Sequence, residues 1–262
     1  MLEGYDRVSF RFDGTTHDVY CGGSGPAVIV IHEIPGITPE VLRFAGRVKE
    51  AGFRVYLPHL FGEPGRPVSA GYLARSMLHA CISREFKVLA RNEASPVTIW
   101  LRALAREALR ECGGPGVGAL GMCLTGNFAL AMMIDPAVQA PVLSQPSLPF
   151  PISKSHRRAL HLAPEQLEVV KQRVRDGCPV LGLRFTNDFT CPRERFERLR
   201  EELGDGFEAI EIDSSPGNPH GISPRAHSVL TMDLVDRDGH PTKQALERVL
   251  AFFRARLLAP SR

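Results

Sequence analysis

Three kinds of residue that could form a nucleophilic catalytic site follow predicted β-strands in the order nucleophile, acid, base. Cys123 lies in GMCLTG, directly after the apolar residues 117–120, and Asp188 follows the apolar residues 179–185. Two histidines, His220 and His227, lie in the segment after residues 207–212. In such a site a thiolate attacks a carbonyl carbon, the histidine takes the proton, and the carboxylate orients the imidazole.

The surroundings of Cys123 are those of a nucleophile on a sharp turn between a strand and a helix. The N-terminus of the following helix favours a thiolate and a developing oxyanion. Gly121 permits the close approach of strand and helix, whereas Thr125 stands where a second glycine is usual and Gly126 comes one residue later. The alternatives are a buried apolar cysteine at 123 and a turn or capping aspartate at 188. The order of the three residues favours the catalytic interpretation.

The elements that must position these residues alternate between strand and helix. Asp13-Gly14 predicts a hairpin over about 7–21, and the continuous apolar run 27–31 is typical of a central parallel strand. Further strands are predicted at 53–58, 117–120, 141–143, 179–185 and 207–212, and helices after Thr38-Pro39 and at 95–111, 164–176, 193–203 and 242–258. This alternation predicts an α/β fold with a mostly parallel sheet and helices on both faces. The chain should form one domain, 1–262, and functional residues should gather at the carboxyl ends of the strands.

Composition excludes several other classes of protein. The 262 residues are 44% hydrophobic and 23% charged, with a net charge of +3 and no apolar run of membrane-spanning length. No concentrated basic face is visible, so we expect neither a nucleic-acid partner nor a membrane partner. The six cysteines include no CxxC pair, and the N-terminus does not resemble a secretory signal. We therefore expect reduced thiols, a cytoplasmic location and no metal.

The chain from about 27 to 258 resembles the dienelactone hydrolase family of α/β-hydrolases. The motifs that carry the resemblance are GMCLTG with Cys123, HEIPG with Glu33, PVLGLRFTND with Asp188, and a histidine in a late loop. The resemblance implies a Cys-His-Asp triad without a cofactor, in which Glu33 takes part in activating the thiol. It also implies that the backbone amides of Leu124 and Ile34 form the oxyanion hole.

The resemblance leaves two assignments open. His227 lies 25 residues before Phe252, a spacing close to that of the family, whereas His220 lies in a Pro-Gly-x-x-His turn like that of the family. We expect His227 to be the base, with His220 as the alternative. Arg84 falls where the family has an arginine for the substrate carboxylate; otherwise it pairs with a surface acid such as Glu85.

The expected function is hydrolysis of a small ester or lactone through an acyl-cysteine intermediate, in a monomer or homodimer. Two alternatives share this fold. One is a thiol acyltransferase, which forms the same acyl-enzyme. The other is a non-catalytic protein that binds a small ligand and uses Cys123 as a redox-sensing thiol.

Overall fold

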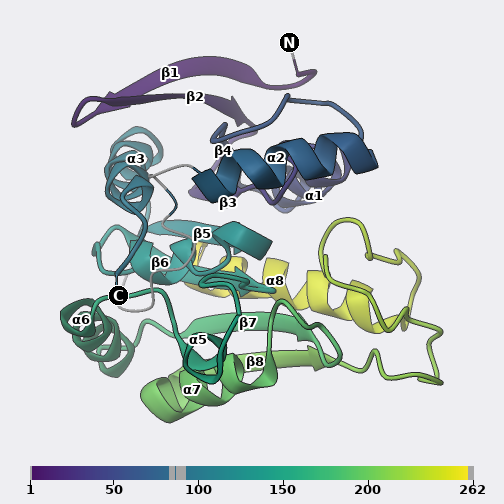
Figure 1. Cartoon of the computed structure of the whole chain (residues 1–262). Coiled ribbons are helices and arrows are strands. Elements are labelled where there is room, and N and C mark those ends of the chain that lie inside the picture. Colours follow the sequence, from purple (N-terminus) through teal and green to yellow (C-terminus); the bar gives the residue numbers. More distant parts are fainter. Residues whose placement is uncertain (1, 83–85, 87–92, 259–262) are drawn as a thin grey trace.

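The computed structural model describes residues 2–82, 86 and 93–258, which form an eight-stranded sheet with helices on both faces (Figure 1). The strand order is β1-β2-β4-β3-β5-β6-β7-β8. The first two strands run antiparallel to their neighbours, and the strands from β4 to β8 are parallel. The strands are β1 (Asp6–Phe12), β2 (Thr15–Gly22), β3 (Ala27–Ile31), β4 (Arg54–Pro58), β5 (Val117–Met122), β6 (Val138–Ser144), β7 (Val180–Phe185) and β8 (Phe207–Ile212).

The helices connect these strands in the order that the predicted alternation requires, and the predicted α/β fold class is confirmed. They are α1 (Pro39–Glu50), α2 (Ala70–Ile82), α3 (Val97–Cys112), α4 (Phe128–Met132), α5 (Lys154–Arg158), α6 (Pro164–Arg175), α7 (Arg193–Leu203) and α8 (Pro241–Leu257), with short 3-10 turns at Cys123–Thr125 and Gly204–Gly206. The sequence did not predict α2 or α5. Among the described residues, no helix is long and apolar enough to cross a bilayer.

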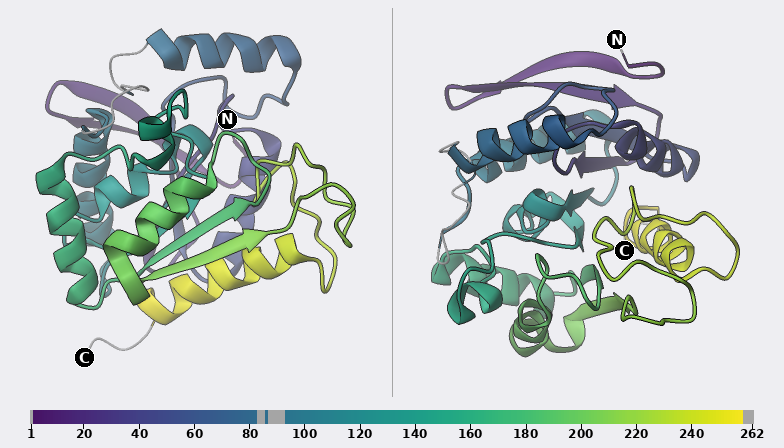
Figure 2. Two further views of the ribbon diagram at one scale, coloured as in Figure 1. Left: turned by 60° about the horizontal axis from the view of Figure 1, so that its bottom comes forward. Right: turned by 45° about the vertical axis from the view of Figure 1, so that its right-hand side comes forward.

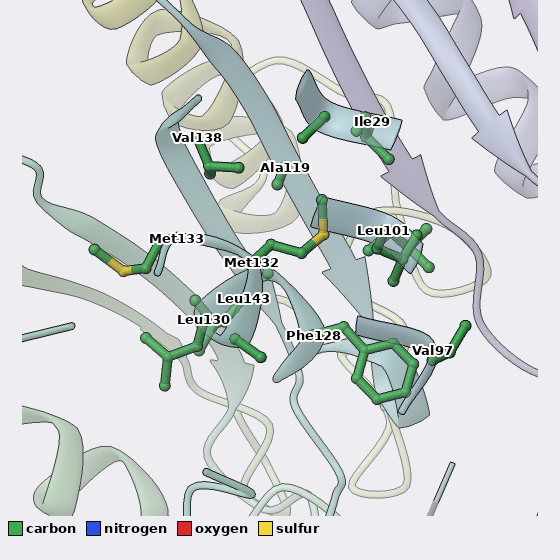
Figure 3. Packing of buried hydrophobic residues seen from close by; sticks show 14 of the residues in the cluster. Ile29, Val97, Leu101, Ala119, Phe128, Leu130, Met132, Met133, Val138 and Leu143 are labelled. Carbon is green, nitrogen blue, oxygen red and sulfur yellow. The ribbon is translucent and has the colours of Figure 1, made fainter. Parts of the chain in front are cut away.

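Two hydrophobic cores flank the sheet, because successive side chains of a strand point to opposite faces. In β3, Ile29 packs with α3 and α4 on one face, whereas Val28 and Val30 pack with α1 and α8 on the other. All five residues of β3 are fully buried, as expected for a central parallel strand. Figure 3 shows part of the first core, with Ile29 of β3 and Leu101 of α3 among its members.

The hairpin of β1 and β2 covers one edge of the sheet. Its turn consists of Asp13 and Gly14, both with positive φ, as in a type I′ turn. The ring of Trp100 on α3 lies 5.3 Å from that of Phe10 and 5.0 Å from that of His17. The hairpin is therefore packed against the helices of the first core.

The long connection between β8 and α8, residues 213–240, lies beyond the carboxyl ends of the strands (Figure 2). It contains no regular helix or strand and consists of turns, bends and irregular chain. The ends of β3, β5 and β7 reach the same edge, so residues that are far apart in the sequence meet there.

Candidate active site

Cys123 occupies a tight turn at the end of β5. Its φ is +54°, a left-handed conformation that is uncommon for a residue with a side chain. A Cβ at Gly121 would lie 2.1 Å from the carbonyl oxygen of Thr125, and one at Gly126 would lie 2.4 Å from Cα of Pro146. Both glycines are therefore required by the close packing of the turn.

Thr125 binds this turn to the end of the neighbouring strand β3. Its hydroxyl accepts a hydrogen bond from the N–H of Met122 at 3.0 Å. The same hydroxyl lies 3.0 Å from the carbonyl oxygen of Ile31 and 3.2 Å from that of His32, either of which can accept its proton. At position 125, where a glycine is usual, the threonine thus stabilises the turn through hydrogen bonds. Gly126, the next residue, leaves room for the close approach of Pro146.

His227 and Asp188 form a hydrogen-bonded pair beside Cys123. The distance from Nδ1 of His227 to Oδ2 of Asp188 is 2.7 Å. Oδ1 of Asp188 accepts hydrogen bonds from the backbone N–H and the hydroxyl of Thr190, at 2.9 and 2.8 Å. The Thr190 hydroxyl oxygen also lies 3.0 Å from Nδ1 of His227. These contacts hold the Nδ1 side of the imidazole, so that Nε2 is the nitrogen available for the thiol.

The environment favours a protonated His227 and an ionised Asp188. Burial alone would lower the pKa of His227, but the charge and hydrogen bonds of Cys123 and Asp188 outweigh it and raise the pKa well above its usual value. Burial would likewise raise the pKa of Asp188, but hydrogen bonds from His227 and Thr190 lower it. Together these shifts support a charged pair in which the imidazolium faces both the sulfur and the carboxylate.

Glu33 is a buried carboxylate at the end of β3. It accepts hydrogen bonds from Ser228 at 2.8 Å, from Gln145 at 3.2 Å and from Thr231. Burial raises the pKa of Glu33, although its hydrogen bonds to Thr231 and Ser228 oppose the shift. Ser228 directly follows His227, the candidate base. Its hydrogen bond to Glu33 therefore holds the loop of His227 next to the end of the central strand β3.

The cavity at the carboxyl ends of the strands brings together most of the residues predicted for the site. Its volume is about 650 Å³, and Cys123, Asp188, His227, Glu33 and Ile34 all line it. Leu124, whose amide is expected in the oxyanion hole, directly follows Cys123 in the 3-10 turn. Arg84 lies outside the described residues, so its role stays a prediction.

His220 and a further histidine, His32, lie elsewhere. His220 is exposed and lines a separate cavity of about 230 Å³, where its ring lies 5.7 Å from that of His240. His32 is fully buried, with Nδ1 3.0 Å from the carbonyl oxygen of Glu33 and Nε2 accepting the N–H of Leu60 at 3.1 Å. Burial lowers the pKa of His32 to about 3, which keeps this ring neutral.

Several polar residues around Cys123, His227 and Asp188 were not identified from the sequence. Thr190 lies two residues after Asp188, a spacing typical of an Asx turn, and this signal could have found it. Asp233 accepts the backbone N–H groups of His227 and Ser228, each at 2.9 Å. No local pattern indicates the contacts of Ser228 and Thr231 with Glu33, which is almost 200 residues away in the chain.

The mostly parallel sheet, the helices on both faces and the cysteine on a left-handed turn after a central strand define an α/β-hydrolase. Within this class, the model of the dienelactone hydrolase family matches residues 17–257. The chain therefore belongs to the dienelactone hydrolase family, a family of hydrolases. A search of curated proteins gave no match.

Solved structures of this family share the fold at low sequence identity. A protein of Klebsiella pneumoniae subsp. pneumoniae MGH 78578, assigned as a dienelactone hydrolase, is 19% identical with a TM-score of 0.64, over 95% of this chain and 97% of that one. The dienelactone hydrolase of Anabaena variabilis ATCC 29413 is 15% identical with a TM-score of 0.60, over 97% and 100%. A dienelactone hydrolase-like promiscuous phosphotriesterase from metagenomic libraries is 15% identical with a TM-score of 0.58, over 97% and 98%.

Proposed function

We propose that the protein hydrolyses a small ester or lactone through an acyl-cysteine intermediate. The observation that carries this proposal is the geometry around Cys123. Its sulfur lies on a left-handed turn in the same cavity as the hydrogen-bonded pair of His227 and Asp188. A nucleophile, a base and an acid that orients the base are the groups required for acyl transfer.

In the first half of the reaction, the Cys123 thiolate attacks the carbonyl carbon of the ester, and the proton of the thiol is held on His227. A C–S bond forms, and the carbonyl oxygen becomes an oxyanion that accepts hydrogen bonds from the backbone N–H groups of Leu124 and Ile34. Collapse of this intermediate breaks the bond from carbon to the alcohol oxygen. The imidazolium of His227 protonates the leaving alkoxide, and the product is a thioester of Cys123.

In the second half, neutral His227 takes a proton from water. The resulting hydroxide attacks the thioester carbonyl, the C–S bond breaks, and the free acid leaves. Asp188 keeps Nδ1 of the imidazole protonated and oriented throughout. Glu33 tunes the thiol by fixing the loop of His227 through its hydrogen bond from Ser228.

Intact-mass measurement with a panel of p-nitrophenyl esters and lactones tests the proposal. We expect the mass of the protein to increase by one acyl group early in turnover, and we expect the increase and the turnover to vanish in Cys123→Ala. In H₂¹⁸O the released acid should carry one ¹⁸O from the solvent. Turnover by Cys123→Ala at the wild-type rate would exclude the acyl-cysteine.

The same experiment separates the two alternative functions. A thiol acyltransferase would form the adduct but release it mainly to an added thiol or amine rather than to water. A redox-sensing protein would form no adduct with any ester, and only its reaction with peroxide would change the mass of Cys123.

A further inference from the structure

Large apolar side chains form part of the lining of the Cys123 cavity. These side chains are Ile34, Leu73, Met77, Phe150, Phe189 and Met232. They come from the turn after β3, from α2 and from the three connections that follow β6, β7 and β8. The same cavity also holds Cys123 and the pair of His227 and Asp188.

Four of these six side chains are exposed although the chain has two well-formed cores in which to bury them. The exposed fraction is 36% for Met77, 52% for Met232 and 71% for Phe189. Met77 and Leu73 lie four residues apart on α2, so they share one face of that helix and both line the cavity. An exposed apolar cluster that opens onto a nucleophile is the usual form of a small-molecule site.

The charged groups of the cavity lining favour an apolar substituent over an anionic one. Glu33, Asp188 and Asp233 are three carboxylates on the lining, whereas Arg225 is its one arginine or lysine among the described residues. Asp188 is paired with His227, but Glu33 and Asp233 are bound to neutral hydroxyl, amide and backbone groups. The protonated His227 and Arg225 balance two of the carboxylates, so the described lining offers no surplus of positive charge to an added carboxylate.

From these observations we infer that the cavity selects esters with a hydrophobic acyl group, which Met77 and Met232 contact. This inference rests on the proposed function, because it concerns the substrate of the same site. Methionine side chains are flexible and polarisable, so they can adapt to acyl groups of different shape. The arginine that the family resemblance implies, Arg84, would give the opposite preference, for an acyl group that ends in a carboxylate.

A series of p-nitrophenyl esters measures this selectivity. We expect kcat/KM to rise about two- to fourfold for each methylene from acetate to hexanoate, as burial of a methylene predicts. The ester whose acyl chain ends in a carboxylate should react at least tenfold more slowly than its uncharged analogue of the same length. Faster reaction of the anionic ester, or a kcat/KM that does not change with chain length, would overturn the inference.

Two variants and a matched control test whether Met77 and Met232 cause the increase in kcat/KM with acyl chain length. Met77→Ser and Met232→Ser should each reduce the increase per methylene to about 1.5-fold or less. The control is Leu78→Ser, since Leu78 is the next residue on α2, is 64% exposed and does not line the cavity. This variant should keep the wild-type slope; an equal loss of slope in Leu78→Ser, or none in Met77→Ser and Met232→Ser, would contradict the inference.

Binding to Cys123→Ala distinguishes failure of the inference from failure of the proposed function. Equilibrium dialysis of this variant with the acetate and hexanoate esters should give at least tenfold tighter binding of hexanoate, and Met77→Ser should remove most of the difference. If wild-type protein hydrolyses no ester but this binding preference holds, the proposed function is wrong and the hydrophobic site stands. If esters are hydrolysed but neither rate nor binding depends on chain length, the inference is wrong and the proposed function stands.

Discussion

His227 and His220 differ in their surroundings although they are only seven residues apart. His227 contacts Asp188 and lines the cavity of Cys123, whereas His220 is exposed and lines another cavity. The spacing to Phe252 and these contacts both favour His227 as the base, and this assignment stays a prediction.

We predict that His227→Ala lowers kcat for ester hydrolysis by about 10³-fold or more, as removal of a triad base does in other enzymes. His220→Ala should change kcat by about tenfold or less, because this side chain does not face the sulfur. Steady-state kinetics on one p-nitrophenyl ester compares the two variants. A larger loss in His220→Ala would assign the base to the Pro-Gly turn.

The pair of His227 and Asp188 also predicts a pH dependence. The raised pKa of His227 keeps the imidazole protonated well above pH 6.5, and this proton is lost as the pH rises through the raised value. We therefore expect kcat/KM to fall on an alkaline limb that lies well above pH 6.5.

In Asp188→Asn the negative charge that helps to raise the pKa of His227 is gone, so the alkaline limb should move to lower pH. The maximal kcat should also decrease, since the amide does not hold the same tautomer. A profile of kcat/KM from pH 5 to 10 for both proteins makes the comparison. An alkaline limb at the same pH in both would show that Asp188 does not act on His227.

The turn that joins β5 to α4 depends on glycine for steric reasons. A Cβ at Gly121 would lie 2.1 Å from the backbone oxygen of Thr125, and a backbone atom cannot move away without moving Cys123. In contrast, a Cβ at Gly46, within α1, would have no atom within 4 Å.

Gly121→Ala should therefore reduce the free energy of unfolding by about 2 kcal/mol or more and lower kcat strongly, because overpacking shifts the backbone. Gly46→Ala should raise the free energy of unfolding by about 0.5–1 kcal/mol, since alanine favours a helix interior over glycine, and leave kcat unchanged. Urea unfolding and ester kinetics test both variants. Equal effects would mean that the turn tolerates a side chain at 121.

The two hydrophobic cores lie on opposite faces of one continuous sheet. We therefore propose that residues 1–262 form one domain. Every strand from β1 to β8 is hydrogen-bonded to its neighbour in a continuous order. Trp100, the one tryptophan of the sequence, packs against Phe10 and His17 of the hairpin at one edge of that sheet. Its fluorescence therefore reports on a part of the molecule remote from β7 and β8.

We predict that Trp100 fluorescence and far-ultraviolet circular dichroism give coincident urea unfolding curves, as expected of a cooperative domain. Circular dichroism reports on all helices, including α7, which precedes β8 at the edge of the sheet opposite to the hairpin. Loss of Trp100 fluorescence at a distinctly lower urea concentration would show that the hairpin and α3 unfold separately.

Local patterns in the sequence determined the fold class and the positions of Cys123 and Asp188. Each of the two residues follows a mostly apolar segment that can be recognised as a strand from its composition. The carboxyl ends of parallel strands lie at one edge of the sheet, so the two residues are expected near each other. Helix α2 was not predicted from its sequence, residues 70–82. Ser69 caps this helix, since its hydroxyl accepts the backbone N–H of Tyr72 at 3.3 Å. This serine follows a Gly/Pro-rich loop and the first turn of the helix has no acidic residue, so the start signal is a single residue.

The candidate nucleophile, acid and bases, and their order along the chain, can be predicted from the amino-acid sequence. The three-dimensional fold is needed to see which histidine contacts Asp188, which hydroxyls bind Glu33 and which apolar side chains line the cavity. These contacts join residues that are far apart along the chain. Strand and helix periodicity reflects interactions between residues a few positions apart, whereas Glu33 and Thr231 meet only after the whole sheet between them has formed.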